Sequence, residues 1–349
     1  MAQRGDFHLD NHVTIDDVSI RAGVSKTTVS RYLNGKYEHM SKKTKLKIEG
    51  IIDELDYRPN MIAKSLKSKK TGLIGVIVSD VTNPVTVTLI KGIIDYCTQQ
   101  GYQVVTASSD EKTQNEEEYV MSMVDRQVEG LIVNIVDYHQ YTHLESLVKK
   151  GVKIVLADRT ISEPVIDMVT TDNYAMTCKT IKKLYALGYD IVSLFSSNLL
   201  MSNVRLSRYN AFLDESAQHI SDPSRFVYLF NEDREDDYKR ALEQFLSMYA
   251  VSGKKVAIFA ATPMALSNLL GAAYELGIKI PEDLGICAYD NLPWTKFVNG
   301  GITVVNQPFY EVGVESAKIL IKRIQHGVLD DPKYVELKSQ LILRNSTNI

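Results

Sequence analysis

The chain has 349 residues, of which 44% are hydrophobic and 24% are charged. This length exceeds one ordinary core and predicts two or three globular domains, and the composition excludes a disordered chain. No apolar run of about 18 residues occurs and no secretory signal is recognisable, so we expect a cytoplasmic protein without membrane contact. Cys97, Cys178 and Cys287 lack CxxC spacing, which indicates reduced thiols and neither disulfides nor a metal site.

The net charge of −3 is unevenly distributed. Residues 1–70 contain 14 of the 40 Lys and Arg residues and 9 of the 43 Asp and Glu residues, so this part carries +5 and the remainder −8. A basic head on an acidic body indicates that only the head meets a polyanion such as DNA. On charge alone, chance segregation of solvated residues explains the asymmetry equally well.

Two short helices joined by a tight turn are predicted between residues 14 and 33. Thr14 can cap the first helix with support from Asp17 three residues later, and Gly23 ends it. Ser25 can cap the second helix, which ends at Asn34. Together with a third helix over residues 41–55, this is the helix-turn-helix pattern, whose second helix enters the major groove of DNA.

The start of the second helix carries side chains that can read base edges. Lys26 and Arg31 can donate to guanine, and the methyl groups of Thr27 and Thr28 can contact thymine. The alternative is a solvated face on a small protein-binding bundle.

The following segment, residues 58–72, has five basic and no acidic residues. It predicts either a plain lysine-rich linker or a short helix, residues 61–66, that folds on DNA and wedges Leu66 into the minor groove.

From Gly72 onward, apolar strand-like runs alternate with helical stretches. The runs are residues 73–78, 103–107, 131–135, 153–157, 191–195, 226–229, 256–259 and 284–288. Repeated βα units predict parallel sheets with helices on both faces, and their number predicts two lobes. Polar residues such as Ser79, Asn134, Asp158 and Asp290 follow several runs, where α/β sheets bind small polar ligands, although polar residues follow strands in any α/β protein.

Enzyme and cofactor signatures are weak. The sequence contains no GxGxxG and no phosphate-binding loop, so no cofactor is expected. His139 and His143 are i,i+4 neighbours without an HExxH motif, and we expect them at the surface.

The segments TIDDVSIRAGVSKTTVSRYLNG, LDYRPNMIAKSL and TGLIGVIVSDVTNP resemble the LacI/GalR family of transcriptional regulators in order and spacing. The resemblance continues through VEGLIV, TTDNYA and ELGIKIPEDLGICAYDNLPW to the closing LILRNST, and SKTTVSRYLNGKYEHMS with RLSRY is similar to the ketodeoxygluconate-regulator-like branch. It implies a non-enzymatic repressor that binds operator DNA as a homodimer under the control of a small molecule, often a sugar. A transport-type solute-binding protein and an α/β enzyme are the competing interpretations. The head argues against the first, and the missing loops argue against the second.

By this resemblance the chain divides into three parts. Residues 13–58 form the helix-turn-helix head, 59–72 the hinge helix and linker, and 73–349 the effector-binding and dimerisation domain. That domain resembles periplasmic binding proteins, with doubly wound parallel sheets in two discontinuous lobes. The first lobe is expected over 73–170 and 303–328, and the second over 171–300 and 331–349.

The resemblance also assigns site residues. The implied DNA contacts are Lys26, Thr27, Thr28, Arg31, Asn34, Tyr57, Asn60 and Leu66. The implied effector contacts are Ser79, Asn134, Asp158, Arg205 and Asp290.

Several residues depart from the family pattern. Val85 stands where many members carry an aromatic residue, and Arg208 replaces a common glycine. An arginine such as Arg205 facing Asp290 without aromatic cover predicts a sugar acid or sugar phosphate as effector. A neutral sugar remains the alternative.

Overall fold

The computed structural model describes residues 13–58, 71–199, 201–230, 234–249, 253–327 and 331–348. By its internal contacts the chain divides into two units, Met1–Thr71 and Gly72–Ile349, here called the head and the sensor. The predicted hinge helix, residues 61–66, lies outside the described residues. Within the described ranges, no helix is long and apolar enough to span a membrane.

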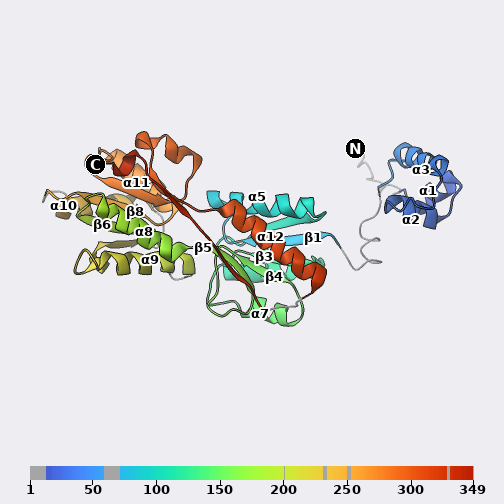
Figure 1. The fold of residues 1–349 in the computed structure, drawn as a ribbon, viewed down its shortest axis with the longest axis horizontal. Coiled ribbons are helices and arrows are strands. Elements are labelled where there is room, and N and C mark those ends of the chain that lie inside the picture. Colours follow the sequence, from blue (N-terminus) through green and yellow to red (C-terminus); the bar gives the residue numbers. More distant parts are fainter. Residues whose placement is uncertain are drawn as a thin grey trace, which may run out of the picture. The chain divides into compact units, whose positions relative to one another are not determined.

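The head is a three-helix bundle, as predicted, and its helices are α1 (Ile15–Ala22), α2 (Lys26–Leu33) and α3 (Lys42–Glu54) (Figure 1). The first helix begins at a reciprocal cap, in which the N–H of Asp17 donates to Thr14 and the N–H of Thr14 donates to the Asp17 carboxylate at 2.8 Å. It ends at Gly23, whose φ of 61° is a left-handed conformation that glycine adopts without strain. Ser25 caps α2 by accepting from the N–H of Thr28.

The core of the head is apolar and small. It consists of the buried side chains Val18, Ala22, Val29, Ile48, Ile51 and Tyr57. The four-residue spacing of Val18 and Ala22 in α1 and the three-residue spacing of Ile48 and Ile51 in α3 turn one face of each of these helices inward. The opposite face of α2, with Lys26, Thr27 and Arg31, is left exposed to solvent.

The sensor contains two six-stranded sheets, one in each lobe. The first lobe has the strand order β11-β5-β4-β3-β1-β2, and the second has β12-β10-β9-β8-β6-β7. The first-lobe strands are β1 (Leu73–Val78), β2 (Gln103–Ser108), β3 (Gly130–Val133), β4 (Ile154–Ala157), β5 (Asp167–Thr171) and β11 (Tyr334–Leu337). The second-lobe strands are β6 (Ile191–Ser197), β7 (Val227–Phe230), β8 (Val256–Ala260), β9 (Gly285–Tyr289), β10 (Thr303–Asn306) and β12 (Gln340–Ile342). All pairs are parallel except β10 with β12.

Helices cover both faces of each sheet, which confirms the doubly wound architecture (Figure 1). In the first lobe, α5 (Pro84–Gln99) and α12 (Phe309–His326) pack on one face, and α6 (Thr113–Asp125) and α7 (Thr142–Lys149) on the other. In the second lobe, α10 (Glu235–Tyr249) and α11 (Pro263–Glu275) pack opposite α8 (Asn173–Ala186) and α9 (Asn203–Ser216). Each of the eight predicted strand-like runs overlaps a strand.

The lobes are discontinuous, but the expected bounds were wrong at two places. Residues 303–306 form β10 of the second lobe, paired with β9, and residues 334–337 form β11 of the first lobe, paired with β5. The chain therefore passes between lobes at residues 171–173, 306–309 and 337–340. Backbone pairing decides the assignment, because a strand belongs to the sheet whose carbonyl and N–H groups it satisfies.

Two glycines allow α5 and α12 to approach closely. A Cβ on Gly92 would lie 2.1 Å from the carbonyl oxygen of Tyr310, and a Cβ on Gly313 would lie 2.2 Å from that of Leu89. The two helices therefore meet backbone to backbone in the first lobe. This contact holds α12, which follows the second lobe's β10 in sequence, against the first lobe.

Candidate functional site

Three of the predicted effector residues form one hydrogen-bonded chain in the first lobe. The Ser79 hydroxyl donates to Oδ1 of Asn134 at 2.7 Å, and the amide of Asn134 donates to Oδ2 of Asp158 at 3.2 Å. These residues follow β1, β3 and β4, whose carboxyl ends meet at the same edge of the sheet. The structure thus brings together side chains that are up to 79 positions apart.

Asp158 retains an unsatisfied oxygen. Its Oδ1 is buried and, among the described residues, has no hydrogen-bond partner. Burial raises the pKa of Asp158, while the positive charges of Arg159, Arg208 and Arg205 act in the opposite direction. A buried carboxylate oxygen without a donor costs free energy, so this atom is suited to accept a hydrogen bond from a ligand hydroxyl.

Asp290 lies in the second lobe at the end of β9 and is only 3% exposed. Its Oδ1 accepts from the amide of Gln307 at 2.7 Å. The pKa of Asp290 is raised to about 6, chiefly by burial; the charge of Arg208 and the hydrogen bond from Gln307 act to lower it, and the charge of Asp158 acts to raise it. The two aspartates belong to different lobes, yet the charge of Asp158 is close enough to affect the pKa of Asp290.

Arg205 faces the first lobe from α9. Its Nη1 donates to the carbonyl of Asn198 at 3.1 Å, and its Nη2 lies 3.8 Å from Oε1 of Glu111 in the first lobe. The Arg205 side chain is 24% exposed, so part of it is accessible to solvent. Arg205 on α9 therefore lies against the first lobe, where its charge also acts to lower the pKa of Asp158. Its role as an effector contact stays a prediction.

Arg208, noted in the sequence only as a departure from glycine, is a central residue here. Its side chain is 4% exposed and lies 3.6 Å above the ring of Tyr289. It donates to Asn173 at 2.9 Å, to the carbonyl of Ala261 at 2.6 Å and to Gln307 at 3.3 Å. Asn173 and Gln307 belong to two of the segments that connect the lobes, so Arg208 ties these segments together beside Asp290.

Sequence reasoning missed Glu111, Asn203 and Gln307. Asn203 on α9 accepts from the N–H of Thr160 at 3.2 Å and donates to its hydroxyl, which links the lobes beside Arg205. Glu111 pairs with both Arg159 and Arg205. None of the three belongs to a chemical motif, and only their position after a strand or at the start of a helix indicated that they lie near the site.

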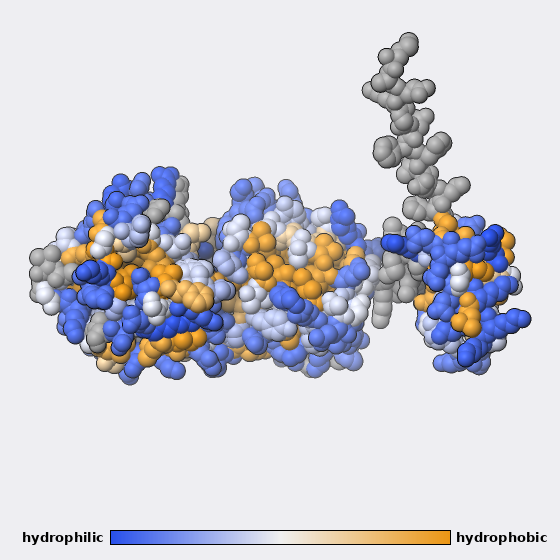
Figure 2. All heavy atoms as spheres, turned by 90° about the horizontal axis from the view of Figure 1, so that it is seen from above, coloured by the Kyte–Doolittle hydropathy of each residue, from blue (hydrophilic) through white to orange (hydrophobic). Residues whose placement is uncertain are grey.

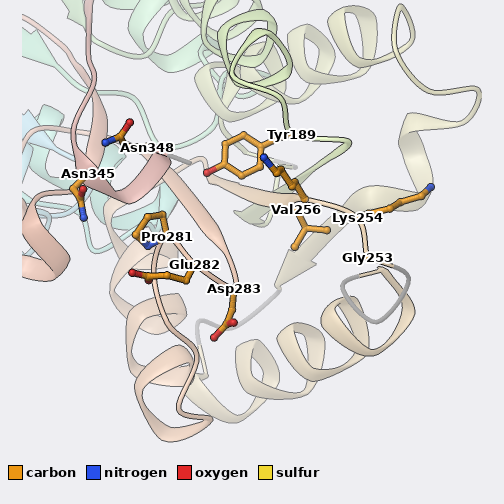
Figure 3. A pocket seen from close by; sticks show the side chains of 10 residues that line it. Tyr189, Gly253, Lys254, Val256, Pro281, Glu282, Asp283, Asn345 and Asn348 are labelled. Atoms are coloured by element: carbon orange, nitrogen blue, oxygen red, sulfur yellow. The ribbon is translucent and has the colours of Figure 1, made fainter.

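A separate surface pocket of about 670 Å³ lies at the amino ends of the second-lobe strands (Figure 3). It is lined by residues that precede β6, β8 and β9, among them Tyr189, Lys254, Lys255, Glu282 and Asp283. None of the predicted effector residues lines it. It is therefore a different place from the edge of the sheet that carries Asp290.

The two histidines differ in their surroundings. His139 is exposed, as predicted, but the expectation for His143 was wrong. Its side chain is 16% exposed, and its Nε2 lies 3.1 Å from Oε1 of Glu116, which is completely buried. Among the described residues, no group of three or more His, Cys, Asp or Glu side chains is placed to hold a metal ion.

The predicted base-reading side chains lie on the exposed face of α2. Lys26, Thr27 and Arg31 are exposed, and the ammonium of Lys26 pairs with Asp16 of α1. The Thr28 hydroxyl is only partly available, since it bonds to that of Ser25 at 2.9 Å.

The remaining predicted DNA contacts have varied positions. Asn34 ends α2 and donates to the carbonyl of Ser30 at 2.8 Å. Tyr57 is 8% exposed and packs in the core of the head. Asn60 and Leu66 lie outside the described residues. The DNA contacts therefore stay predictions.

Comparison with known proteins identifies both units. Residues 14–60 match the model of bacterial regulatory proteins of the lacI family, and residues 182–347 match that of a periplasmic binding protein-like domain. The chain is 34% identical to the HTH-type transcriptional regulator KdgR of Bacillus subtilis over 96% of this chain and 98% of the relative. It is 32% identical to the HTH-type transcriptional regulator PtxS of Pseudomonas putida over 97% of both chains. The chain belongs to the LacI family.

A solved structure agrees with the fold described above. The lac repressor dimer bound to operator and the anti-inducer ONPF matches with a TM-score of 0.82 and 24% identity, over 96% of this chain and 99% of that one. This likeness confirms the predicted fold, a helix-turn-helix head followed by a two-lobed sensor. The LacI-family chain is accordingly a DNA-binding transcriptional regulator controlled by a small effector, as the sequence predicted.

Proposed function

We propose that this regulator is a cytoplasmic homodimeric repressor without enzymatic activity, whose operator affinity responds to a sugar acid or sugar phosphate bound between the lobes. The contacts are those predicted, namely Ser79, Asn134, Asp158, Arg205 and Asp290. The observation that carries the proposal is the buried, unpartnered Oδ1 of Asp158, which lies within electrostatic reach of Arg205, Arg208 and Asp290. Such a group needs a donor that a polyhydroxy ligand supplies.

The charges around this site favour an acidic ligand. Arg208 donates to Asn173, to the carbonyl of Ala261 and to Gln307, all of which are neutral acceptors. Burial raises the pKa of Asp158 and Asp290 and so opposes their negative charge, whereas Arg205 and Arg208 bring positive charge to the site. A carboxylate or phosphate at Arg205 compensates this charge, and its planar fork of donors matches either group.

The proposal is tested by calorimetry with glucose, gluconate and glucose 6-phosphate on the wild type and on Arg205→Ala. We expect one of the acids to bind more tightly than glucose and to lose about 1.5–3 kcal/mol in the variant, because a charge-assisted contact disappears. Arg225→Ala is the matched control, since Arg225 is exposed in the short helix Pro223–Phe226. A wild-type preference for glucose, or equal losses for all three ligands, contradicts the acidic effector.

Exposed apolar side chains of the first lobe support the homodimer. They include Val81, Val87, Ile94 and Val105. Figure 2 shows an apolar area on this lobe, and such areas mark interfaces between proteins.

We expect sedimentation equilibrium to give a dimer for the wild type, and Val87→Asp to shift the equilibrium toward the monomer. Leu46→Asp, an exposed site in the head, is the control. A monomeric wild type at concentrations that shift operator DNA rules the dimer out.

A further inference from the structure

Glu111 follows β2 in a turn with an uncommon backbone. Asp110 and Glu111 have φ of 53° and 55°, in the left-handed region that residues other than glycine rarely adopt. The turn is held because the N–H of Glu111 donates to the carbonyl of Ser79 at 2.7 Å, and the Ser108 hydroxyl donates to the Asp110 carboxylate at 2.7 Å. Backbone strain of this kind persists where surrounding contacts fix a side chain in a required direction.

The carboxylate of Glu111 lies between arginines of different lobes. Both of its oxygens accept from Arg159, with Nη1 3.0 Å from Oε2. Arg159 is itself fixed, since it also donates to the carbonyls of Ile135 and Val136. Arg205 of the second lobe lies 3.8 Å from Oε1. Burial acts to raise the pKa of Glu111, but the hydrogen bonds and charge of Arg159 and the charge of Arg205 outweigh it, so the carboxylate stays ionised.

Arg159 and Arg205 therefore hold Glu111 differently. The contact with Arg159 is bidentate and within one lobe, whereas the contact with Arg205 is longer and crosses between lobes. The neighbouring cross-lobe pair, Thr160 with Asn203, uses only neutral groups. If a ligand contact moves Arg205 away from the first lobe, Glu111 can keep its ion pair with Arg159.

We propose that Glu111 determines the charge specificity of the sensor, an inference that rests on the proposed acidic effector. Without effector, its carboxylate is an internal anion beside Arg205. An acidic ligand group that binds Arg205 replaces this carboxylate and is repelled by it. A neutral sugar carries no charge, so it neither displaces the Glu111 carboxylate from Arg205 nor is repelled by it. Glu111 thus weakens the binding of acidic ligands selectively and sets the concentration at which the regulator responds.

The first test compares Glu111→Gln with the wild type in the same calorimetric series of glucose, gluconate and glucose 6-phosphate. We expect the affinity for the preferred acid to rise about three- to tenfold and that for glucose to stay within about twofold. Glu118→Gln, an exposed site on α6, is the control for loss of one negative charge. If wild-type protein prefers glucose, the proposed function fails. If the wild type prefers an acid, and Glu111→Gln and Glu118→Gln both bind that acid with wild-type affinity, only the proposed role of Glu111 fails.

A second test needs no effector. In Glu111→Gln, Arg159 and Arg205 lose their shared carboxylate, so inorganic phosphate should raise the Tm of this variant more than that of the wild type or of Glu118→Gln. Should Glu111→Gln fail to fold, Glu111→Asp keeps the negative charge but shortens the side chain by one methylene, which moves the carboxylate away from Arg205, and a smaller phosphate response in the same direction is expected. Equal phosphate responses in all folded proteins overturn the inference.

Discussion

Asp158 and Asp290 occupy equivalent positions in the two lobes. Each directly follows the fourth strand of its lobe along the chain, β4 or β9, and each has a left-handed backbone, with φ of 70° and 77°. The N–H of Asp158 donates to the carbonyl of Val169 at 2.8 Å, and that of Asp290 to the carbonyl of Val305 at 3.0 Å. Both carboxyl groups are thereby fixed at strand ends, and aspartate is among the few residues that tolerate this conformation.

The burial of Asp290 predicts a conflict between stability and ligand binding. Its pKa is raised to about 6 by burial, so the folded protein holds the proton more strongly than the unfolded chain does. The free energy of unfolding should therefore decrease as the pH rises through about 4 to 6, because the charged form is disfavoured in the fold. Asp290→Asn removes this cost. Its free energy of unfolding should therefore exceed that of the wild type by about 2–3 kcal/mol near pH 8 but not near pH 4.

Effector binding should respond in the opposite direction. Ionised Asp290 accepts hydrogen bonds from ligand hydroxyls, so wild-type affinity should fall as the pH decreases below about 6. Asp290→Asn should bind weakly at every pH. Denaturant unfolding at both pH values and calorimetry between pH 5 and 8 measure the two effects. Equal pH dependence of stability in both proteins refutes the assignment.

Local signals allowed much of the fold to be predicted. The caps at Thr14 and Ser25 located the start of both helices of the helix-turn-helix unit, since side-chain oxygens there satisfy free N–H groups. Continuous apolar runs located the central strands, which are buried on both faces. Strand β5 was missed because it begins at Asp167, whose charge is hidden by a bidentate pair with Arg323 from α12.

The rest depends on contacts between distant parts of the chain. The pairing of β11 with β5 joins segments that no local pattern connects, and β11 contains no fully buried residue. Arg208 reaches Gln307 across 99 positions, and Glu111 reaches Arg159 across 48. Such pairs form only once distant segments have folded together, so the sequence predicted the polar strand ends but not their partners.

The exposed face of α2 predicts base recognition by Lys26 and Thr27. The double variant Lys26→Ala/Thr27→Ala should prefer a different operator sequence, since each good base contact contributes about 1–3 kcal/mol of discrimination. Lys43→Ala, at the exposed start of α3, should instead weaken binding to all sequences alike. Selection of bound sites from a random DNA library measures both. An unchanged preferred sequence in the double variant excludes base reading by this pair.

Leu66, in the predicted hinge, should act on the shape of the DNA. Leu66→Ala should reduce DNA bending and operator affinity, because an apolar wedge between base pairs is lost, while effector binding stays unchanged. Met61→Ala provides a control within the same segment. A gel-bending assay that shows equal bending with wild-type protein and Leu66→Ala rejects the wedge.

The pair of His143 and Glu116 predicts a large effect on stability. Glu116 is fully buried and accepts from the N–H of Val136 at 2.7 Å, and His143 is the basic group beside its other oxygen. His143→Leu replaces this polar neighbour of a buried carboxyl oxygen by an apolar side chain and should cost about 1–3 kcal/mol. The exposed His139→Leu should change stability by less than about 0.5 kcal/mol. Similar unfolding midpoints for the two variants contradict this.

The close approach of α5 and α12 predicts that Gly92 tolerates no side chain. A Cβ there would lie 2.1 Å from the carbonyl oxygen of Tyr310, and backbone atoms of a packed helix cannot retreat as a flexible side chain does. Gly92→Ala should therefore destabilise the sensor by about 3 kcal/mol, although alanine favours helix more than glycine. Gly50→Ala in α3 meets nothing within 4 Å and should stabilise the head by about 0.5–1 kcal/mol. Thermal unfolding should show a lower Tm for Gly92→Ala and a higher Tm for Gly50→Ala, because only Gly92 packs against a neighbouring backbone. A stabilised Gly92→Ala protein shows instead that the helices can move apart.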